Sequence, residues 1–160
     1  TCRPIFSDAA AATIVEKCKE SKIGPFIFKT DGSGGKHLIV QNKKGTGVLY
    51  MNGPEVLKFS LNLVPSATKE LLKKASLSQK DISLFLFHQA SAVVLNKLKK
   101  KLKIDDSQWF MDIENFGNTV SATIPIAIST LKESGTFPKN GKVCLMGFGV
   151  GLSVAGCIIN

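Results

Sequence analysis

The spacing of apolar residues predicts a long helix and a buried strand in the middle of the chain. Residues 53–75 carry an apolar stripe of helical period, formed by Leu57, Leu61, Val64, Leu71, Leu72 and Ala75. Pro54 suits the first turn of this helix, whereas Pro65 lies inside it and is expected to kink it. Residues 81–87, DISLFLF, form an almost continuous apolar run of strand length, which is typical of a strand buried on both faces.

Two shorter helices are predicted after this strand. Ser91 is expected to cap the first of them, whose lysines mostly project away from its apolar face. That apolar face carries Leu95, Leu98 and Leu102. The second helix spans residues 119–133 and ends at Gly135. Its apolar face carries Ile124, Ile128 and Leu131.

The remaining predicted strands are short, and together with the helices they set the fold class. They cover residues 9–18, 24–30, 109–113, 142–148 and 151–159, with a glycine-rich turn between the last two. Residues 31–47 are glycine-rich and polar, which predicts a flexible loop. The alternation of strands and helices predicts an α/β fold with a mixed, mainly parallel five-stranded sheet covered by helices.

Length and composition fit one globular domain over residues 1–160. Apolar residues make up 44% of the 160 positions and charged residues 21%. No apolar run reaches the roughly 18 residues needed to cross a bilayer, and the first residues do not form a signal-peptide pattern. Because the chain lacks an initiator Met, we expect it to be processed or to be a piece of a longer protein.

The cysteines predict a reducing, cytoplasmic location. The chain has four, Cys2, Cys18, Cys144 and Cys157, and no pair shows metal-ligand spacing. With only two histidines in the chain, this argues against a metal site.

The net charge of +9 indicates acidic partners, but Arg3 is the only arginine. Sequence-specific recognition of bases depends largely on bidentate arginine side chains, so a specific nucleic acid is not expected as partner. A membrane is not expected as partner either.

Three candidate features follow predicted strands. His88 comes directly after residues 81–87, Asn118 lies between the predicted strand at 109–113 and the next helix, and residues 147–151 read GFGVG. Each alone is more often structural: a solvated or satisfied His, a turn with an Asn cap, and a hairpin turn. In open α/β sheets, however, ligands bind beyond the carboxyl ends of the strands, where all three features are expected to converge.

Together the motifs resemble one family, the β-ketoacyl-acyl-carrier-protein synthases III of the thiolase superfamily. HQAS at 88–91 resembles the HQAN motif of the family, and FGNTVSATIPIAI resembles its GNT segment. GFGVGLSVAG is similar to its closing turn, MNGPEVLKFS to the segment that opens the helix before the His, and SDAAAATIV to the entry strand of its second half. The resemblance covers essentially the whole chain and implies the C-terminal half of a thiolase-like fold.

The resemblance implies a decarboxylative Claisen condensation of acyl-CoA with malonyl-carrier protein, in fatty-acid or related polyketide biosynthesis. His88 and Asn118 would donate hydrogen bonds to the malonyl thioester carbonyl, where negative charge develops. The backbone N–H of Val150 would serve the oxyanion of the acyl thioester. The residues implied to line the pantetheine arm or substrate are Gly53, Ser91 and Phe148. No resident cofactor or metal is implied, because the substrates carry CoA and 4′-phosphopantetheine.

The sequence departs from the family pattern at three points. The cysteine nucleophile of the family lies in the N-terminal half, and no cysteine here matches its motif, so the chain alone is expected to be inactive. Ser91 replaces the Asn of HQAN, and Pro54 replaces the Asn of the usual GNEV. Met146, Gly147 and Phe148 stand where true thiolases carry a second Cys, which favours the synthase.

The resemblance also implies partners. Lys58, Lys100 and Lys101 match positions where the family presents basic residues to the acyl carrier protein, although most lysine runs are simply solvated helix faces. The other implied partners are acyl-CoA, the N-terminal half of the same enzyme and a second copy in a homodimer. Two alternatives remain open: a non-catalytic thiolase-like binding or assembly module, and a relative of the type III polyketide synthases.

Overall fold

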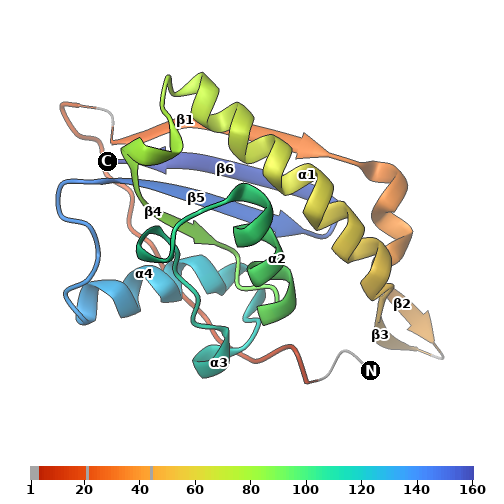
Figure 1. Ribbon diagram of the computed structural model, residues 1–160. Coiled ribbons are helices and arrows are strands. Elements are labelled where there is room, and N and C mark those ends of the chain that lie inside the picture. Colours follow the sequence, from red (N-terminus) through yellow and green to blue (C-terminus); the bar gives the residue numbers. More distant parts are fainter. Residues whose placement is uncertain (1–3, 21, 44) are drawn as a thin grey trace.

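The computed structural model describes residues 4–20, 22–43 and 45–160, and its centre is a four-stranded sheet (Figure 1). The strand order is β1-β6-β5-β4. The strands are β1 (Ile23–Thr30), β4 (Ile82–Phe87), β5 (Lys142–Gly149) and β6 (Ser153–Ile159). Four of the predicted strands are therefore present, within a residue or two of their expected bounds.

The α/β class and the mixed sheet are confirmed, but the described sheet has four strands instead of five and is mainly antiparallel instead of mainly parallel. Only β4 and β5 pair in parallel, while β1 pairs with β6 and β6 with β5 in antiparallel fashion. A short turn joins β5 to β6 and forces them to run in opposite directions. A helical connection precedes β5, and this longer path allows it to lie parallel to β4.

Two helices cover one face of the sheet and a third covers part of the other. Helices α1 (Gly53–Lys74) and α2 (Ala92–Leu102) pack on the face that carries Phe85 and Phe87, which are fully buried. Asn52 caps α1 by accepting from the N–H of Glu55, and α1 continues through Pro65. Helix α4 (Thr123–Glu133) packs on the opposite face. Its contacts there are with Leu84, Leu86 and Val143.

The face of β1 and β6 opposite α1 has no covering helix within the described residues, and we call it the open face. Along β1, Ile27 points toward α1 and is buried, whereas its neighbours Phe26 and Phe28 point the other way. The rings of Phe26 and Phe28 stack with centroids 6.2 Å apart, yet these residues are 45% and 73% exposed. In Figure 1, α4 lies below β4, so it leaves this part of the sheet uncovered.

Three local predictions were wrong. Residues 9–18 form no strand and are exposed. Residues 31–47 are not a loop: they form a 3-10 helix (Gly32–His37) and most of a hairpin, β2 (Leu38–Lys43) with β3 (Thr46–Met51). The predicted strand at 109–113 is reduced to one bridge between Trp109 and Phe85, and the chain then turns into α3 (Ile113–Phe116).

No helix in the described ranges is long and apolar enough to cross a membrane.

Candidate functional site

His88 continues the parallel pairing of β4 one residue past the end of the strand. Its N–H donates to the carbonyl of Met146 on β5 at 2.8 Å, which fixes the backbone at the carboxyl edge of the sheet. Gln89 is buried next to it: its side chain donates to the carbonyl of Phe87 and accepts from the N–H of Asp112, both at 2.8 Å. Ser91 then caps α2 by accepting from the N–H of Val94, as predicted. Hydrogen bonds to β5, to Asp112 and to the first turn of α2 thus fix the whole HQAS segment.

The imidazole of His88 is half-buried and neutral at pH 7. Its Nδ1 lies 2.7 Å from the hydroxyl of Thr123, the first residue of α4. Its ring meets that of Phe148 edge to face, with centroids 5.4 Å apart. Burial lowers the pKa of His88 from 6.5 to about 4, against a smaller opposite effect of the Val120 backbone. A neutral ring can donate a hydrogen bond without being an acid strong enough to protonate an enolate.

The backbone of Asn118 is held by residues from the start of the chain. Its N–H donates to the carbonyl of Ile5 at 2.9 Å, and its carbonyl accepts from the N–H of Ser7 at 3.1 Å. The Ser7 hydroxyl donates to the carbonyl of Phe116. Gly117 has φ +66°, and a Cβ there would lie 2.9 Å from Ser7 Oγ, so only glycine lets the two segments approach. We call residues 5–7 the N-terminal strap.

The side chain of Asn118 is buried and oriented by two hydrogen bonds. Its Oδ1 accepts from the N–H of Val120 at 2.9 Å, and its Nδ2 donates to the carbonyl of Ala90 at 3.2 Å. Since Ala90 follows His88 by two residues, this bond ties the Asn118 loop to the His88 segment. The N–H of Val120 fixes which atom of the amide is oxygen, and the second Nδ2 hydrogen is left for another acceptor.

Val120 links the two predicted catalytic residues through its own backbone. Its φ of +55° is rare for a β-branched residue. While its N–H bonds to Asn118, its carbonyl oxygen lies 3.1 Å from the Thr123 hydroxyl oxygen and also raises the pKa of His88. The left-handed backbone of Val120 therefore interacts with the side chains of both Asn118 and His88.

The glycine-rich turn between β5 and β6 lies at the same edge. Val150 at its tip is 68% exposed, and Phe148, two residues before it, is the residue whose ring meets His88. Gly151 has φ +137°, and a Cβ there would lie 2.2 Å from Ser153 Oγ. Leu152 pairs with Asp31 through two backbone hydrogen bonds of 2.8 and 3.1 Å. His88, Asn118 and residues 147–151 lie at the same end of the sheet, and we call them the site edge.

The lysines predicted to dock a carrier protein lie on helices α1 and α2. Lys100 and Lys101 lie in the last turn of α2, about 14–15 Å along the helix from Ser91. Lys58 on α1 pairs with Glu55 at 3.9 Å and is exposed. Gly53 is the first residue of α1.

No described cysteine lies at the site edge. Cys144 is buried in the core, where burial raises the pKa of its thiol. Cys157 lies on β6 and its pKa is raised for the same reason, while Cys18 is exposed in the segment before β1. Cys2 lies outside the described residues. Within the described ranges no three His, Cys, Asp or Glu side chains are grouped as metal ligands.

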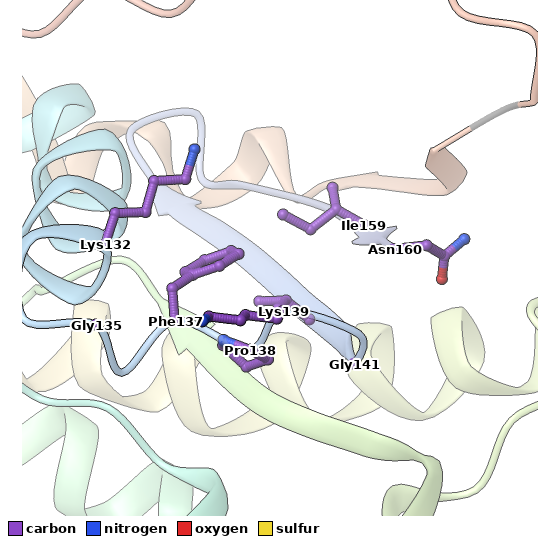
Figure 2. Close-up of a pocket in the computed structure, with 9 residues that line it drawn as sticks. Lys132, Gly135, Phe137, Pro138, Lys139, Gly141, Ile159 and Asn160 are labelled. Carbon is purple, nitrogen blue, oxygen red and sulfur yellow. The ribbon is translucent and has the colours of Figure 1, made fainter.

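A separate pocket of about 330 Å³ lies at the opposite end of the sheet (Figure 2). It is lined by the start of β5, the end of β6 and the loop after α4, where Lys132 Nζ lies 5.8 Å from the ring centroid of Phe137. None of the predicted site residues lines it, so it is not part of the site edge.

Sequence reasoning missed three parts of the site: the N-terminal strap, Gln89 and Thr123. Gln89 and Thr123 both lie inside the quoted motifs, HQAS and FGNTVSAT, but were given no role. The sequence signal that could have revealed Gln89 and Thr123 is that each is a polar residue close to His88 or Asn118 within these motifs. The strap offered none, because it lies more than a hundred residues from its partners.

The chain is also similar to proteins of known family. Residues 72–160 match the family model described as 3-oxoacyl-[acyl-carrier-protein (ACP)] synthase III C terminal. The chain is 35% identical over 150 residues to a β-ketoacyl-[acyl-carrier-protein] synthase III of Staphylococcus aureus (strain JH1), covering 93% of this chain and 47% of the relative.

Two solved structures show the same fold. A crystal structure of a 3-oxoacyl-(acyl-carrier-protein) synthase III superposes with a TM-score of 0.83 at 39% identity, covering 92% of this chain and 50% of the other. The priming β-ketosynthase of the R1128 polyketide biosynthetic pathway has a TM-score of 0.83 at 30% identity, with coverages of 89% and 46%. The chain thus spans about half the length of the relatives it matches.

Proposed function

Because this chain belongs to the family of 3-oxoacyl-[acyl-carrier-protein] synthase III C-terminal domains, we propose that it forms the C-terminal half of a β-ketoacyl-acyl-carrier-protein synthase III. The observation that carries the proposal is the site edge, where a buried neutral imidazole and an oriented carboxamide are tied to the same backbone segment. Such an arrangement suits the stabilisation of a developing oxyanion rather than proton abstraction.

The proposed reaction has two halves. A cysteine thiolate of the N-terminal half attacks the carbonyl of acyl-CoA, the bond to the CoA sulfur breaks, and an acyl-cysteine remains. Malonyl-carrier protein then loses carbon dioxide, and the electron pair of the broken C–C bond moves to the thioester as an enolate. The enolate carbon attacks the acyl-cysteine carbonyl, a new C–C bond forms and the cysteine thiolate leaves.

The residues of this chain act on the oxygens that gain charge. His88 and Asn118 donate to the malonyl thioester oxygen, which becomes negative as carbon dioxide leaves. The N–H of Val150 donates to the oxyanion formed on the acyl carbonyl, which explains why the exposed valine side chain at this position is tolerated. Ser91, Phe148 and Gly53 line the path of the pantetheine arm. The reaction needs no resident cofactor, because CoA and 4′-phosphopantetheine carry the thioesters.

The proposed partner is the acyl carrier protein, which docks on Lys58, Lys100 and Lys101. Lys101 lines an open groove of about 620 Å³ between the C-terminal ends of α1 and α2. Lys69, Lys73 and Lys103 also line this groove, and no carboxylate does. This uncompensated charge supports the binding of an acidic protein.

The N-terminal half and a second copy would cover the apolar side chains that this chain leaves exposed. Ile14 is 87% exposed, and the open face exposes Phe28. Neither a nucleic acid nor a membrane is proposed as partner. The proposed location is the cytoplasm, because the free thiols of Cys18, Cys144 and Cys157 suit a reducing compartment.

A role in priming polyketide synthesis is a second candidate, favoured by the similarity to the R1128 priming ketosynthase. It uses the same site edge and differs only in the acyl group and the carrier protein.

The test separates the two half-reactions in an enzyme completed by a cysteine-bearing N-terminal half. His88→Ala should slow carbon dioxide release from malonyl-carrier protein about a hundredfold to a thousandfold and leave acyl transfer to the cysteine largely intact. His37→Ala, at the other histidine, is the matched control and should leave both steps unchanged. If His88→Ala releases carbon dioxide at the wild-type rate, the proposed role of His88 is wrong; if the completed wild-type enzyme releases none, a non-catalytic docking module becomes the better description.

A further inference from the structure

Thr123 has a single hydroxyl proton and two acceptors close to it. Its side chain is almost fully buried, at 3% exposure, so the hydroxyl has little access to solvent. Oγ1 lies 2.7 Å from Nδ1 of His88 and 3.1 Å from the carbonyl oxygen of Val120. The hydroxyl can donate to one of these acceptors at full strength, and its choice decides which nitrogen of the neutral imidazole carries the proton.

The two choices have opposite chemical consequences. If the hydroxyl donates to Val120, Nδ1 must carry the ring proton and donate to Thr123, and Nε2 is then an acceptor. If the hydroxyl donates to Nδ1, the ring proton lies on Nε2. Only the second arrangement gives His88 an N–H with which to stabilise a negative oxygen, whereas the first makes it a base.

The distances favour the second arrangement. Hydrogen bonds that a hydroxyl donates to oxygen are most often about 2.7–2.8 Å long, and those that an N–H donates to oxygen about 2.9–3.0 Å. The 2.7 Å contact between Thr123 and His88 fits a hydroxyl donor, and the 3.1 Å contact with Val120 is the weaker of the two.

We propose that Thr123 is a positioning residue that donates its hydroxyl proton to Nδ1 and thereby holds His88 in the tautomer with the proton on Nε2. The catalytic consequence rests on the proposed function, but the tautomer itself does not. Thr123 is suited to this task because it begins α4, where the packing of the helix on β4 fixes its backbone. The low pKa of His88 is consistent with this role, because a charged ring would carry protons on both nitrogens.

Val120 is the competing acceptor that makes the proposal testable. Its left-handed backbone directs its carbonyl toward both Thr123 and His88. When the Thr123 hydroxyl is removed, that carbonyl becomes the polar group available to Nδ1. The ring should then move its proton to Nδ1 and leave Nε2 without one.

The first experiment determines the tautomer of His88 in this chain by long-range ¹H–¹⁵N correlation at pH 7. The chain has two histidines, and the His37→Ala variant identifies which signals belong to His88. Wild-type His88 should show the pattern of a proton on Nε2, and so should Thr123→Ser. Thr123→Val should show the proton on Nδ1. Thr130→Val is the matched control on the same helix, because the Thr130 hydroxyl bonds only to the carbonyl of Ile126, and it should match the wild type.

The wild-type spectrum decides the matter even if Thr123→Val fails to fold, because a proton on Nδ1 of His88 would overturn the proposal. An unchanged tautomer in folded Thr123→Val would overturn it as well.

The second experiment measures the consequence in the enzyme completed by a cysteine-bearing half. Thr123→Val should slow carbon dioxide release about a hundredfold, the loss expected for one oxyanion donor. Thr123→Ser should restore most of the rate, and acyl transfer should be unchanged in both. If Thr123→Val leaves carbon dioxide release unchanged while His88→Ala abolishes it, Thr123 has no positioning role. If neither variant affects release, the proposed function fails, whatever the tautomer.

Discussion

Around His88 and Asn118, polar side chains are tied to one another and to the backbone, whereas the open face leaves two phenylalanine rings to solvent. At the site edge, Thr123 and Val120 fix the side chains, and the N-terminal strap holds the loop. On the open face, Phe28 is 73% exposed and stacks only on Phe26. The difference shows that the chain contains the ordering contacts of its polar site but not all the contacts that its apolar surface needs.

The largest loss of stability is expected when the turn of the site edge is disrupted. Gly151→Ala forces a side chain onto a backbone with φ +137° and brings Cβ within 2.2 Å of Ser153 Oγ. We expect a loss of about 3 kcal/mol in the free energy of unfolding, measured by urea denaturation. Gly149→Ala is the matched control two residues away, where a Cβ meets nothing within 4 Å, and it should cost less than about 1 kcal/mol. Equal losses in both variants would contradict this account of the turn.

The burial of His88 predicts how the stability of the site edge depends on pH. The pKa of His88 is about 4 in the fold against 6.5 ordinarily, so the unfolded chain binds the extra proton first as pH falls. This contribution is fully present above pH 6.5 and is lost as pH falls toward 4. Its size is on the order of 3 kcal/mol.

Urea unfolding at pH 7 and pH 4.5 measures this contribution. His88→Gln should lose part of the wild-type pH dependence, and His37→Gln should keep it. A wild-type pH dependence in His88→Gln would show that the ring is not buried as described.

The smallest effect on stability is expected on the open face. Phe28→Thr keeps a residue suited to a strand and removes little buried area, so the free energy of unfolding should change by less than about 0.5 kcal/mol. Self-association, measured by sedimentation velocity, should decrease, because an exposed aromatic surface is lost. The neighbouring Ile27→Ala, on the buried side of the same strand, should instead cost about 2–4 kcal/mol. A large loss of stability in Phe28→Thr would show that the open face is covered within the chain.

Local sequence pattern predicted the elements that pack against other parts of this chain. The apolar run at 81–87 became β4, the stripe from residue 53 became α1, and Ser91 capped α2. Residues 9–18 have strand-like composition, but a strand also needs a pairing partner, and these exposed residues pair with none of the described strands. Residues 31–47 were predicted to be a loop from their glycine and polar content, but the short apolar runs at 38–40 and 48–51 pair with each other in the β2–β3 hairpin.

The site was predictable where it depends on order along the chain and not where it depends on distant contacts. His88 and Asn118 were expected at one edge because each follows a predicted strand, although the second of those strands is only a bridge. Thr123 reaches His88 across 35 positions, and Ser7 reaches Phe116 across 109. No periodic pattern in the sequence encodes such pairs.

The N-terminal strap also constrains the order in which the chain can fold. Ser7 and Phe116 bond across 109 positions, so this contact closes one of the longest loops in the molecule. Contacts of such separation form slowly, since most of the chain must already be compact before they become favourable. During synthesis, residues 5–7 leave the ribosome before Asn118 and can bond to it only once it has emerged. We therefore expect α1, β4 and α2, which follow one another closely in the sequence, to assemble before Asn118 is fixed.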